Sequence, residues 1–219
     1  MEIALKEVSG SFHPLQMTFT RFLAGGLFLI PFAVRTLKKK KASLNWKDLP
    51  GFLLLGFVGM VLSMSIYQMS VKEVPASVVA VLFSSNPIFT AVLAFFMLKE
   101  PIRRNQIAAL LLEIGGILAI INPFHTSLSP YGVLLAMIST LLFAVYGVMG
   151  KRRCARFGGV VVTCASFLCG GAEMLFMILF SRLPMVNKWL AGSGLELFAN
   201  IPLLSGYSWN TLPWMLMIC

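Results

Sequence analysis

The stretch that decides the fold is ASVVAVLFSSNPIFTAVLAFFMLKEPIRRNQIAALLLEIGGILAII, Ala76–Ile121. It holds two apolar runs joined by a charged elbow, LKEPIRR. As a helix, the first run, Ala76–Leu98, is long enough to cross a hydrocarbon core of ~30 Å at ~1.5 Å per residue. Pro101 is expected to open the second helix, about Asn105–Ile121, because proline is tolerated in a first turn. The stretch therefore predicts a membrane hairpin whose basic turn is cytoplasmic by the positive-inside rule.

The composition supports a membrane protein. Hydrophobic residues make up 58% of the chain and charged residues 12%, whereas soluble domains average about 45–50% and 25%. The net charge of +10 would suggest nucleic acid in a soluble protein. Here the basic residues fall in short loops between apolar runs, so we expect a lipid bilayer and no nucleic acid as partner. The four cysteines lack metal or disulfide spacing, and we expect no metal and no cofactor.

Apolar runs on both sides of the hairpin complete six expected spans, and the alternation of loops orients them. The spans are about 15–33, 49–69, 76–98, 105–121, 131–150 and 159–180, and a final run, LPWMLMIC, resembles the start of another. Loops 35–47, 99–104 and 151–158 then share one side and hold 13 of the 18 Lys and Arg residues. These three loops are predicted to be cytoplasmic, in a multi-pass protein of the plasma or inner membrane. The polar start of the chain is then outside.

The sequence also carries a weak internal repeat. An offset of 145 aligns RFLAGG (21–26) with SFLCGG (166–171), and an offset of 163 aligns Trp46 and Pro50 with Trp209 and Pro213. We interpret residues 1–122 as a first repeat without its first helix and residues 123–219 as a second repeat truncated in its third helix. A complete unit would have five helices, an odd number, so the second copy is inverted. Inverted repeats are an architecture of secondary transporters, with the substrate site at the repeat interface.

Several of these segments resemble a known family. They are the Pro14…Arg21 start of the first span, the run YQMSVKEVPASVVAVLFSSNPIF (67–89), the elbow region 98–116 and YGVLLAMISTLLFAVYGVMGKRR (131–153). Together they resemble the EamA-type members of the drug/metabolite transporter superfamily. The resemblance implies an all-α, ten-helix permease for small metabolites, amino acids or drugs. This chain departs from it by supplying about six complete spans.

The first candidate site is a polar break inside the span 76–98. Pro87 has no N–H and frees a carbonyl one turn back, and in lipid such a carbonyl needs a partner or a water-lined cavity. Ser84, Ser85 and Asn86 could supply that partner or bind a substrate. The alternative is a helix kink that its own serines satisfy.

Three ionisable residues are expected inside spans, where charge is costly and usually marks a pathway or a pair. Arg21 and Glu173 are both expected roughly 9–10 Å from the outer side, so they could pair, and Glu113 is near mid-membrane. Functionally, Glu113 or Glu173 would bind substrate or couple protons, and Arg21 is a further candidate for such a role. The alternatives are a structural ion bridge, or snorkelling of Arg21 to the surface.

Aromatic and amide side chains complete the candidates. Tyr67, Gln68 and Tyr146 could line a cavity or simply pack.

No phosphate loop, Ser-His-Asp order or HExxH motif is present, and His13 and His125 are too few for a metal site, so we do not expect an enzyme. The prediction is a permease that moves a small organic solute by alternating access. The alternative is a truncated, non-transporting membrane protein or a structural or regulatory partner of a complete permease. The sequence leaves homo-oligomerisation open.

Overall fold

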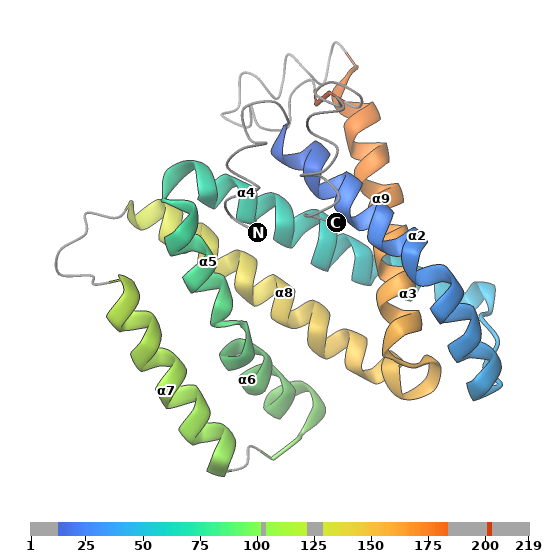
Figure 1. The fold of residues 1–219 in the computed structure, drawn as a ribbon, viewed down its shortest axis with the longest axis horizontal. Helices are drawn as coiled ribbons and strands as arrows, with labels where there is room; N and C mark the ends of the chain where they lie inside the picture. The colour runs from blue at the N-terminus through green and yellow to red at the C-terminus, as the bar shows by residue number, and fades with distance from the viewer. Residues whose placement is uncertain (1–12, 102–103, 122–128, 184–200, 203–219) are drawn as a thin grey trace. The chain divides into compact units, whose positions relative to one another are not determined.

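The computed structural model describes residues 13–101, 104–121, 129–183 and 201–202. These residues form helices and connections without a strand (Figure 1). In chain order the helices are α2 (Pro14–Lys40), η1 (Trp46–Asp48), α3 (Leu49–Gly56), η2 (Phe57–Leu62), α4 (Ser63–Glu73), α5 (Ala76–Ser84), α6 (Asn86–Leu98), α7 (Arg104–Ile121), α8 (Pro130–Phe157) and α9 (Gly159–Ser181). His125, the final LPWMLMIC run and most of the polar start lie outside the described residues.

The expectation of an all-α polytopic membrane protein is confirmed. Within the described residues, five helical segments are long and apolar enough to cross a membrane: 14–40, 46–73, 76–98, 130–157 and 159–181. The sixth expected span corresponds to α7, which is not among these five. The segment 46–73 is one continuous rod made of η1, α3, η2 and α4, and η2 is a π-helical turn within it.

Some helix boundaries differ from the expected ones. Helix α2 continues seven residues past Ala33, because its last turn is rich in lysine, which suits a helix C-terminus. It ends at Lys40, and the next residue, Lys41, has a left-handed backbone (φ 51°) and donates its N–H to the carbonyls of Leu37 and Lys38. The expectation that Pro101 opens α7 was wrong. Helix α6 stops at a left-handed Lys99 (φ 55°), Pro101 is not helical, and α7 is described from Arg104 onward.

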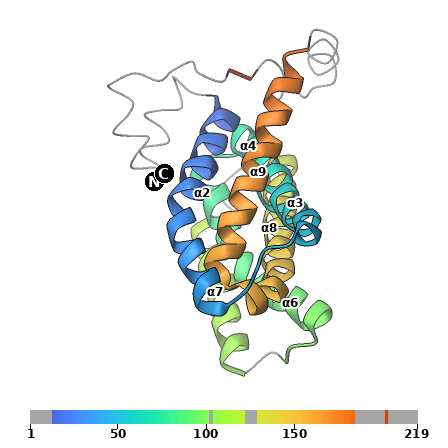
Figure 2. The same cartoon turned by 90° about the vertical axis from the view of Figure 1, so that its right-hand side faces the viewer.

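The chain forms two compact units, Met1–Val61 with Phe157–Cys219, and Leu62–Arg156. In the first unit, α2 and α9 run antiparallel and cross along much of their length, and α3 packs on α9 (Figures 1 and 2). Small residues allow this approach: a Cβ on Gly56 would lie 2.5 Å from the Gly170 amide nitrogen. Glycines at helix crossings are typical of membrane helices, which gain little from the hydrophobic effect and depend on close packing.

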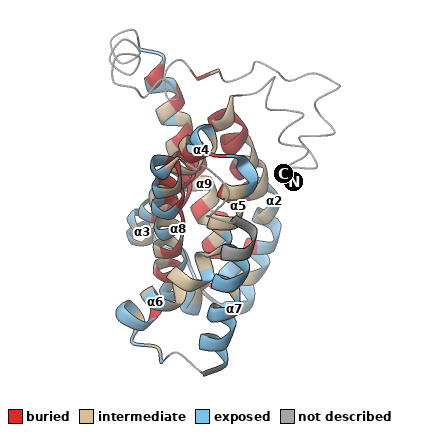
Figure 3. Cartoon of the chain, turned by 90° about the vertical axis from the view of Figure 1, so that its left-hand side faces the viewer, coloured by how far each residue is buried: buried red, intermediate tan, exposed pale blue. Residues whose placement is uncertain are grey.

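The second unit contains α4, α5, α6, α7 and nearly all of α8. Val74, Val79 and Ala136 form a buried apolar cluster in it. Two buried hydroxyls tie the segment 63–73 to α8, since Ser63 Oγ donates to the Ser139 carbonyl at 2.9 Å and Ser70 Oγ to the Gly132 carbonyl at 2.7 Å. Helices α6 and α7 are largely exposed (Figure 3), as expected of apolar helices that face lipid.

Candidate functional site

The span 76–98 is broken where the sequence predicts it. Helix α5 ends at Ser84, Ser85 leaves the helical conformation (ψ 1°), and α6 restarts at Asn86 with Pro87 as its second residue. Ser84 Oγ donates to the Val81 carbonyl at 2.7 Å. Ser85 Oγ donates to the Leu82 carbonyl at 2.6 Å. The serines therefore satisfy carbonyls of their own helix, as the kink interpretation expects, but each hydroxyl oxygen can still accept a hydrogen bond.

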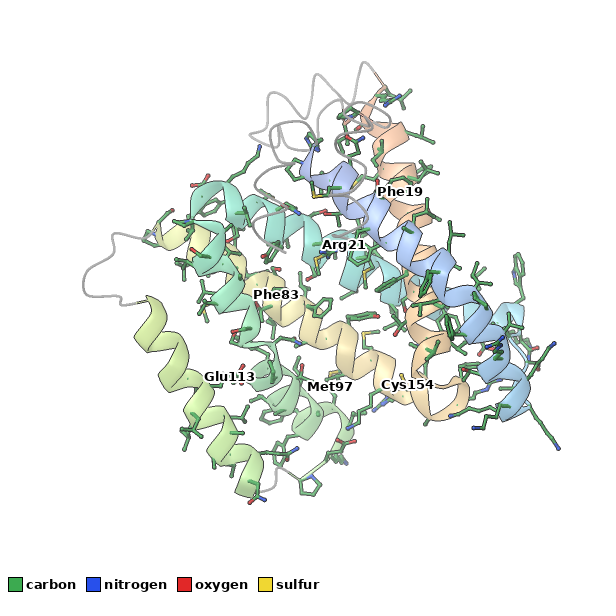
Figure 4. The ribbon with its side chains drawn as sticks, viewed as in Figure 1. Phe19, Arg21, Phe83, Met97, Glu113 and Cys154 are labelled. Atoms are coloured by element: carbon green, nitrogen blue, oxygen red, sulfur yellow. The ribbon has the colours of Figure 1, made fainter. Side chains whose placement is uncertain are left out.

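A row of four aromatic rings adjoins the break. It consists of Tyr67 from α4, Phe83 from α5, and Phe143 and Tyr146 from α8. Successive ring centroids are 5.2, 5.2 and 5.4 Å apart, within the range of favourable ring contacts. Phe83 directly precedes Ser84, and Figure 4 shows it between α5 and α8. We call these four residues the aromatic row.

The aromatic row joins candidates that are far apart in sequence. Tyr67 and Tyr146 occupy its two ends, and Gln68, half-buried, follows Tyr67 on α4. Sequence reasoning named the phenylalanines only as a group and did not single out the two linking residues, Phe83 and Phe143. Two signals could have revealed them: Phe83 adjoins the SSNP motif, and Phe143 lies one helical turn before Tyr146.

Glu113 belongs to the same unit. It is half-buried, whereas Leu111 and Leu112 beside it are 64% and 78% exposed. Figure 4 places it on the side of α7 that faces α5 and α6. A carboxylate on the inner side of a lipid-exposed helix is the arrangement expected of a functional or paired charge.

Arg21 and Glu173 lie in the other unit, and the structure does not show the pair that their expected depths allowed. Within the described residues, no ion pair joins them. The Arg21 guanidinium lies 5.1 Å from the centroid of the Phe22 ring, as a cation–π contact. Glu173 faces a pocket of about 470 Å³ that is lined by residues of η2 and of α9. The carboxylate oxygen Oε2 is buried, and no described residue hydrogen-bonds to it.

A polar cluster joins α6 and α8 at their C-terminal ends. Lys151 forms an ion pair with Glu100, and Arg152 Nη2 donates to the Met97 carbonyl at 2.8 Å. Figure 4 labels Met97, which lies between α6 and the C-terminal part of α8. The contact brings together loops 99–104 and 151–158, which the charge pattern assigned to one side of the membrane. Sequence reasoning did not predict the contact itself.

Comparison with known proteins identifies the family. Residues 2–122 match the model of the EamA-like transporter family, which is more than half of the chain. The chain belongs to the EamA-like transporter family. As an EamA-like protein, it is a multi-pass protein of a lipid bilayer and a member of a permease family.

Relatives of this EamA-like chain bear transporter names. It is 32% identical over 184 residues to an uncharacterized transporter of Clostridium kluyveri, covering 81% of this chain and 59% of the relative. It is 28% identical over 212 residues to the uncharacterized inner membrane transporter YedA of Escherichia coli K12, covering 90% and 65%. A transporter of Archaeoglobus fulgidus is 25% identical over 204 residues, covering 88% and 71%. The chain thus spans about three fifths of the Clostridium relative.

Proposed function

We propose that this chain is the greater part of a secondary transporter that moves a small organic solute by alternating access of two inverted five-helix halves. The observation that carries the proposal is a reciprocal set of contacts between α2 and α9. Phe22 and Phe167, equivalent at the offset of 145, meet with ring centroids 5.0 Å apart at an interplanar angle of 63°. Equivalent residues in mutual contact lie on the axis of a two-fold relation.

The neighbouring contacts follow the same relation. A Cβ on Gly26 would lie 3.0 Å from Leu168, and a Cβ on Gly171 would lie 3.8 Å from Leu23. Gly171 is the equivalent of Gly26, and Leu168 is the equivalent of Leu23. Exchanging the two repeats therefore turns the contact of Gly26 with Leu168 into the contact of Gly171 with Leu23. A two-fold interface requires such reciprocity. This supports a first repeat over 1–122 and an inverted second repeat over 123–219.

The break in span 76–98 supports a solute pathway. Discontinuous helices in secondary transporters expose backbone and polar groups to a cavity near mid-membrane. Ser85 is nine residues after Ala76 and thirteen before Leu98, near the middle of this span. Ser84, Ser85 and Asn86 would meet the solute beside the aromatic row, and Glu113 would supply charge to the same unit.

The competing proposal is a non-transporting membrane protein or a regulatory partner of a complete permease. It is favoured by one fact, that the chain covers only 59% of its Clostridium relative. The two proposals differ in whether the break meets water, because a solute pathway must open to each side in turn whereas a structural kink need not.

The test is thiol accessibility in sealed vesicles. In the full chain with its four cysteines replaced, Ser85→Cys should react with a membrane-impermeant maleimide added from either side. Phe96→Cys is the matched control on α6, since Phe96 is 72% exposed on a lipid-type surface and its thiol should stay unlabelled. Reaction of Ser85→Cys from one side only, or from neither, would contradict alternating access.

A further inference from the structure

The faces of helix α2 have different surroundings. One face packs on α9, where a Cβ on Gly26 would lie 3.0 Å from Leu168. At ~100° per residue, Phe28 is turned by about 160° from Gly26 and faces away from α9. Phe28 opens a line of four exposed residues that recur every three or four positions, so that they share one face of the helix: Phe28, Phe32, Arg35 and Lys39. We call these four residues the α2 stripe.

The half of the α2 stripe that lies nearer the membrane centre is aromatic. The ring centroids of Phe28 and Phe32 are 5.8 Å apart, and these residues are 72% and 46% exposed. Both belong to the 27-residue span 14–40, which is about 40 Å long and exceeds a hydrocarbon core of ~30 Å. The two rings therefore offer a surface to an acyl chain.

The other half of the α2 stripe is basic. Arg35 and Lys39 are one helical turn apart, which puts their Cβ atoms roughly 5–6 Å from each other, so both side chains can reach one phosphate group. Arginine also matches two phosphate oxygens with parallel N–H bonds. Lys40 is directed elsewhere, since its Cε lies 3.6 Å from the place that a Cβ on Gly158 would take. The α2 stripe thus gathers two basic side chains on the face that carries the rings.

Neither basic residue of the α2 stripe has an acidic partner in the described part of the chain. No ion pair there includes Arg35 or Lys39, and the sequence has no Asp or Glu between Glu7 and Asp48. Asp48 is half-buried and accepts a hydrogen bond from the Asn45 N–H at 3.2 Å. Charge complementarity therefore favours an anion from outside the chain.

An anionic phospholipid has a phosphate and an acyl chain in the same order as the two halves of the α2 stripe. Arg35 is seven residues after Phe28, about 10 Å along the helix axis, and it lies nearer the basic end of the helix. In the same way, a headgroup lies outside the chains that it carries. A soluble phosphate would contact the charges and leave the rings without a partner, so the complete stripe favours a lipid.

We propose that the α2 stripe binds one anionic phospholipid, whose phosphate contacts Arg35 and Lys39 and whose acyl chain packs on Phe28 and Phe32. Because the charge pattern predicts that loop 35–47 is cytoplasmic, this lipid belongs to the cytoplasmic leaflet. The inference goes beyond the proposed transport and does not depend on it, since lipid binding is measured without a solute.

The first experiment identifies the lipid that contacts position 28. The full chain, with its four tryptophans replaced by phenylalanine, carries Phe28→Trp and is reconstituted in vesicles of equal parts phosphatidylglycerol and phosphatidylcholine. Bromine on an acyl chain quenches tryptophan on contact, and one of the two lipids is brominated at a time. Quenching should show a preference of about tenfold or more for phosphatidylglycerol, given two basic residues at its headgroup.

Phe176→Trp in the same background is the matched control. Phe176 is 70% exposed, nearly as much as Phe28, and α9 carries no Lys or Arg, so both lipids should quench this tryptophan equally. Equal quenching of Phe28→Trp by the two lipids, or the same preference in Phe176→Trp, would overturn the proposal. Quenching of Phe28→Trp by neither lipid would also overturn it, because protein would then cover the stripe.

The second experiment separates a defined site from a general attraction of the basic loop. In the Phe28→Trp chain, Arg35→Gln and Lys39→Gln should each reduce the preference for phosphatidylglycerol about three- to fivefold. Lys47→Gln removes the same charge from the same loop at an exposed position outside the α2 stripe, and it should leave the preference nearly unchanged. An equal loss in Lys47→Gln and Lys39→Gln would overturn the proposal.

A third measurement needs no variant and is therefore independent of folding defects. Native mass spectrometry of the wild-type chain in a non-ionic detergent should show one retained phosphatidylglycerol, and less phosphatidylcholine of the same acyl chains at equal concentration. Glycerol phosphate, the soluble counterpart of the headgroup, should not displace the lipid when added in excess. Displacement would assign the basic residues to a soluble phosphate, and equal retention of the two lipids would exclude an anion site. Either result would overturn the proposal.

Discussion

Gly56 and Gly170 meet backbone to backbone where α3 crosses α9. A Cβ added to Gly56 would lie 2.5 Å from the Gly170 amide nitrogen and 2.9 Å from its Cα. Neither atom can move aside without displacing a helix. The crossing therefore depends on the absence of two methyl groups.

The first prediction concerns this crossing. Gly56→Ala should separate α3 from α9 and destabilise the protein by about 1–3 kcal/mol, the usual cost of overpacking. Gly147→Ala in α8 is the control, because no atom outside its own stretch of helix lies within 4 Å of the position that its Cβ would take, and alanine is the better helix former. Thermal unfolding of the purified proteins in detergent should show a lower Tm for Gly56→Ala alone. Equal Tm values would show that the helices are not held this closely.

The second prediction concerns the buried hydroxyl of Ser70, which donates to the Gly132 carbonyl at 2.7 Å. Ser70→Ala leaves that carbonyl without this donor and should cost about 0.6–1.7 kcal/mol, as measured for hydrogen bonds between membrane helices. Ser77→Ala, on the exposed start of α5, should cost nothing measurable. Unfolding in a mixed-micelle denaturant series would measure both, and an equal effect of the two variants would contradict the role given to Ser70.

The third prediction concerns the ion pair between Lys151 and Glu100. Both side chains are about half exposed, so a double-mutant cycle with Lys151→Met and Glu100→Gln should give a coupling of only about 0.2–1 kcal/mol. The coupling should fall in roughly 0.5 M salt, since salt screens exposed charges. A coupling that salt does not change would show that water is excluded from the pair.

The fourth prediction concerns orientation. The positive-inside rule assigns loop 35–47 to the cytoplasm, and the alternation of spans then puts Ser129 on the outside. In the cysteine-free chain, Ser129→Cys should react with an impermeant maleimide added to intact cells, and Ser43→Cys should react only after the cells are opened. The opposite pattern would invert the topology.

The sequence was sufficient to predict the five helical segments long and apolar enough to cross a membrane, and the break, because both depend on local chemistry. Hydropathy indicates where the helices lie. Pro87 has no backbone N–H, so it cannot donate a helical hydrogen bond in any surroundings. The pairing of Arg21 with Glu173, which the sequence allowed but did not establish, shows what was missing. Their depths were matched, but depth does not fix the direction in which a side chain points around its helix, and each residue turns that direction by about 100°. Arg21 lies on its own neighbour Phe22, and Glu173 faces a pocket.

Contacts between distant segments were also beyond prediction. Phe83 and Phe143 look like ordinary apolar residues in apolar runs until α5 and α8 are placed beside each other. The π-helical turn Phe57–Leu62 left no mark in the hydropathy pattern either, since its residues are as apolar as those around it. The register of one helix against another decides these features, and a single sequence does not encode that register in its composition.

That π-helical turn limits how the length of this span can change. It adds one residue to the α-helical count, so the residues after it are rotated by about 100° from where an unbroken α-helix would carry them. Phe52 and Leu55 before the turn, and Ser63 and Ser70 after it, are all buried. Loss of one codon between 57 and 62 would turn one of these pairs away from its partners. Such a deletion keeps the reading frame, but we expect it to disrupt the packing on one side of this helix.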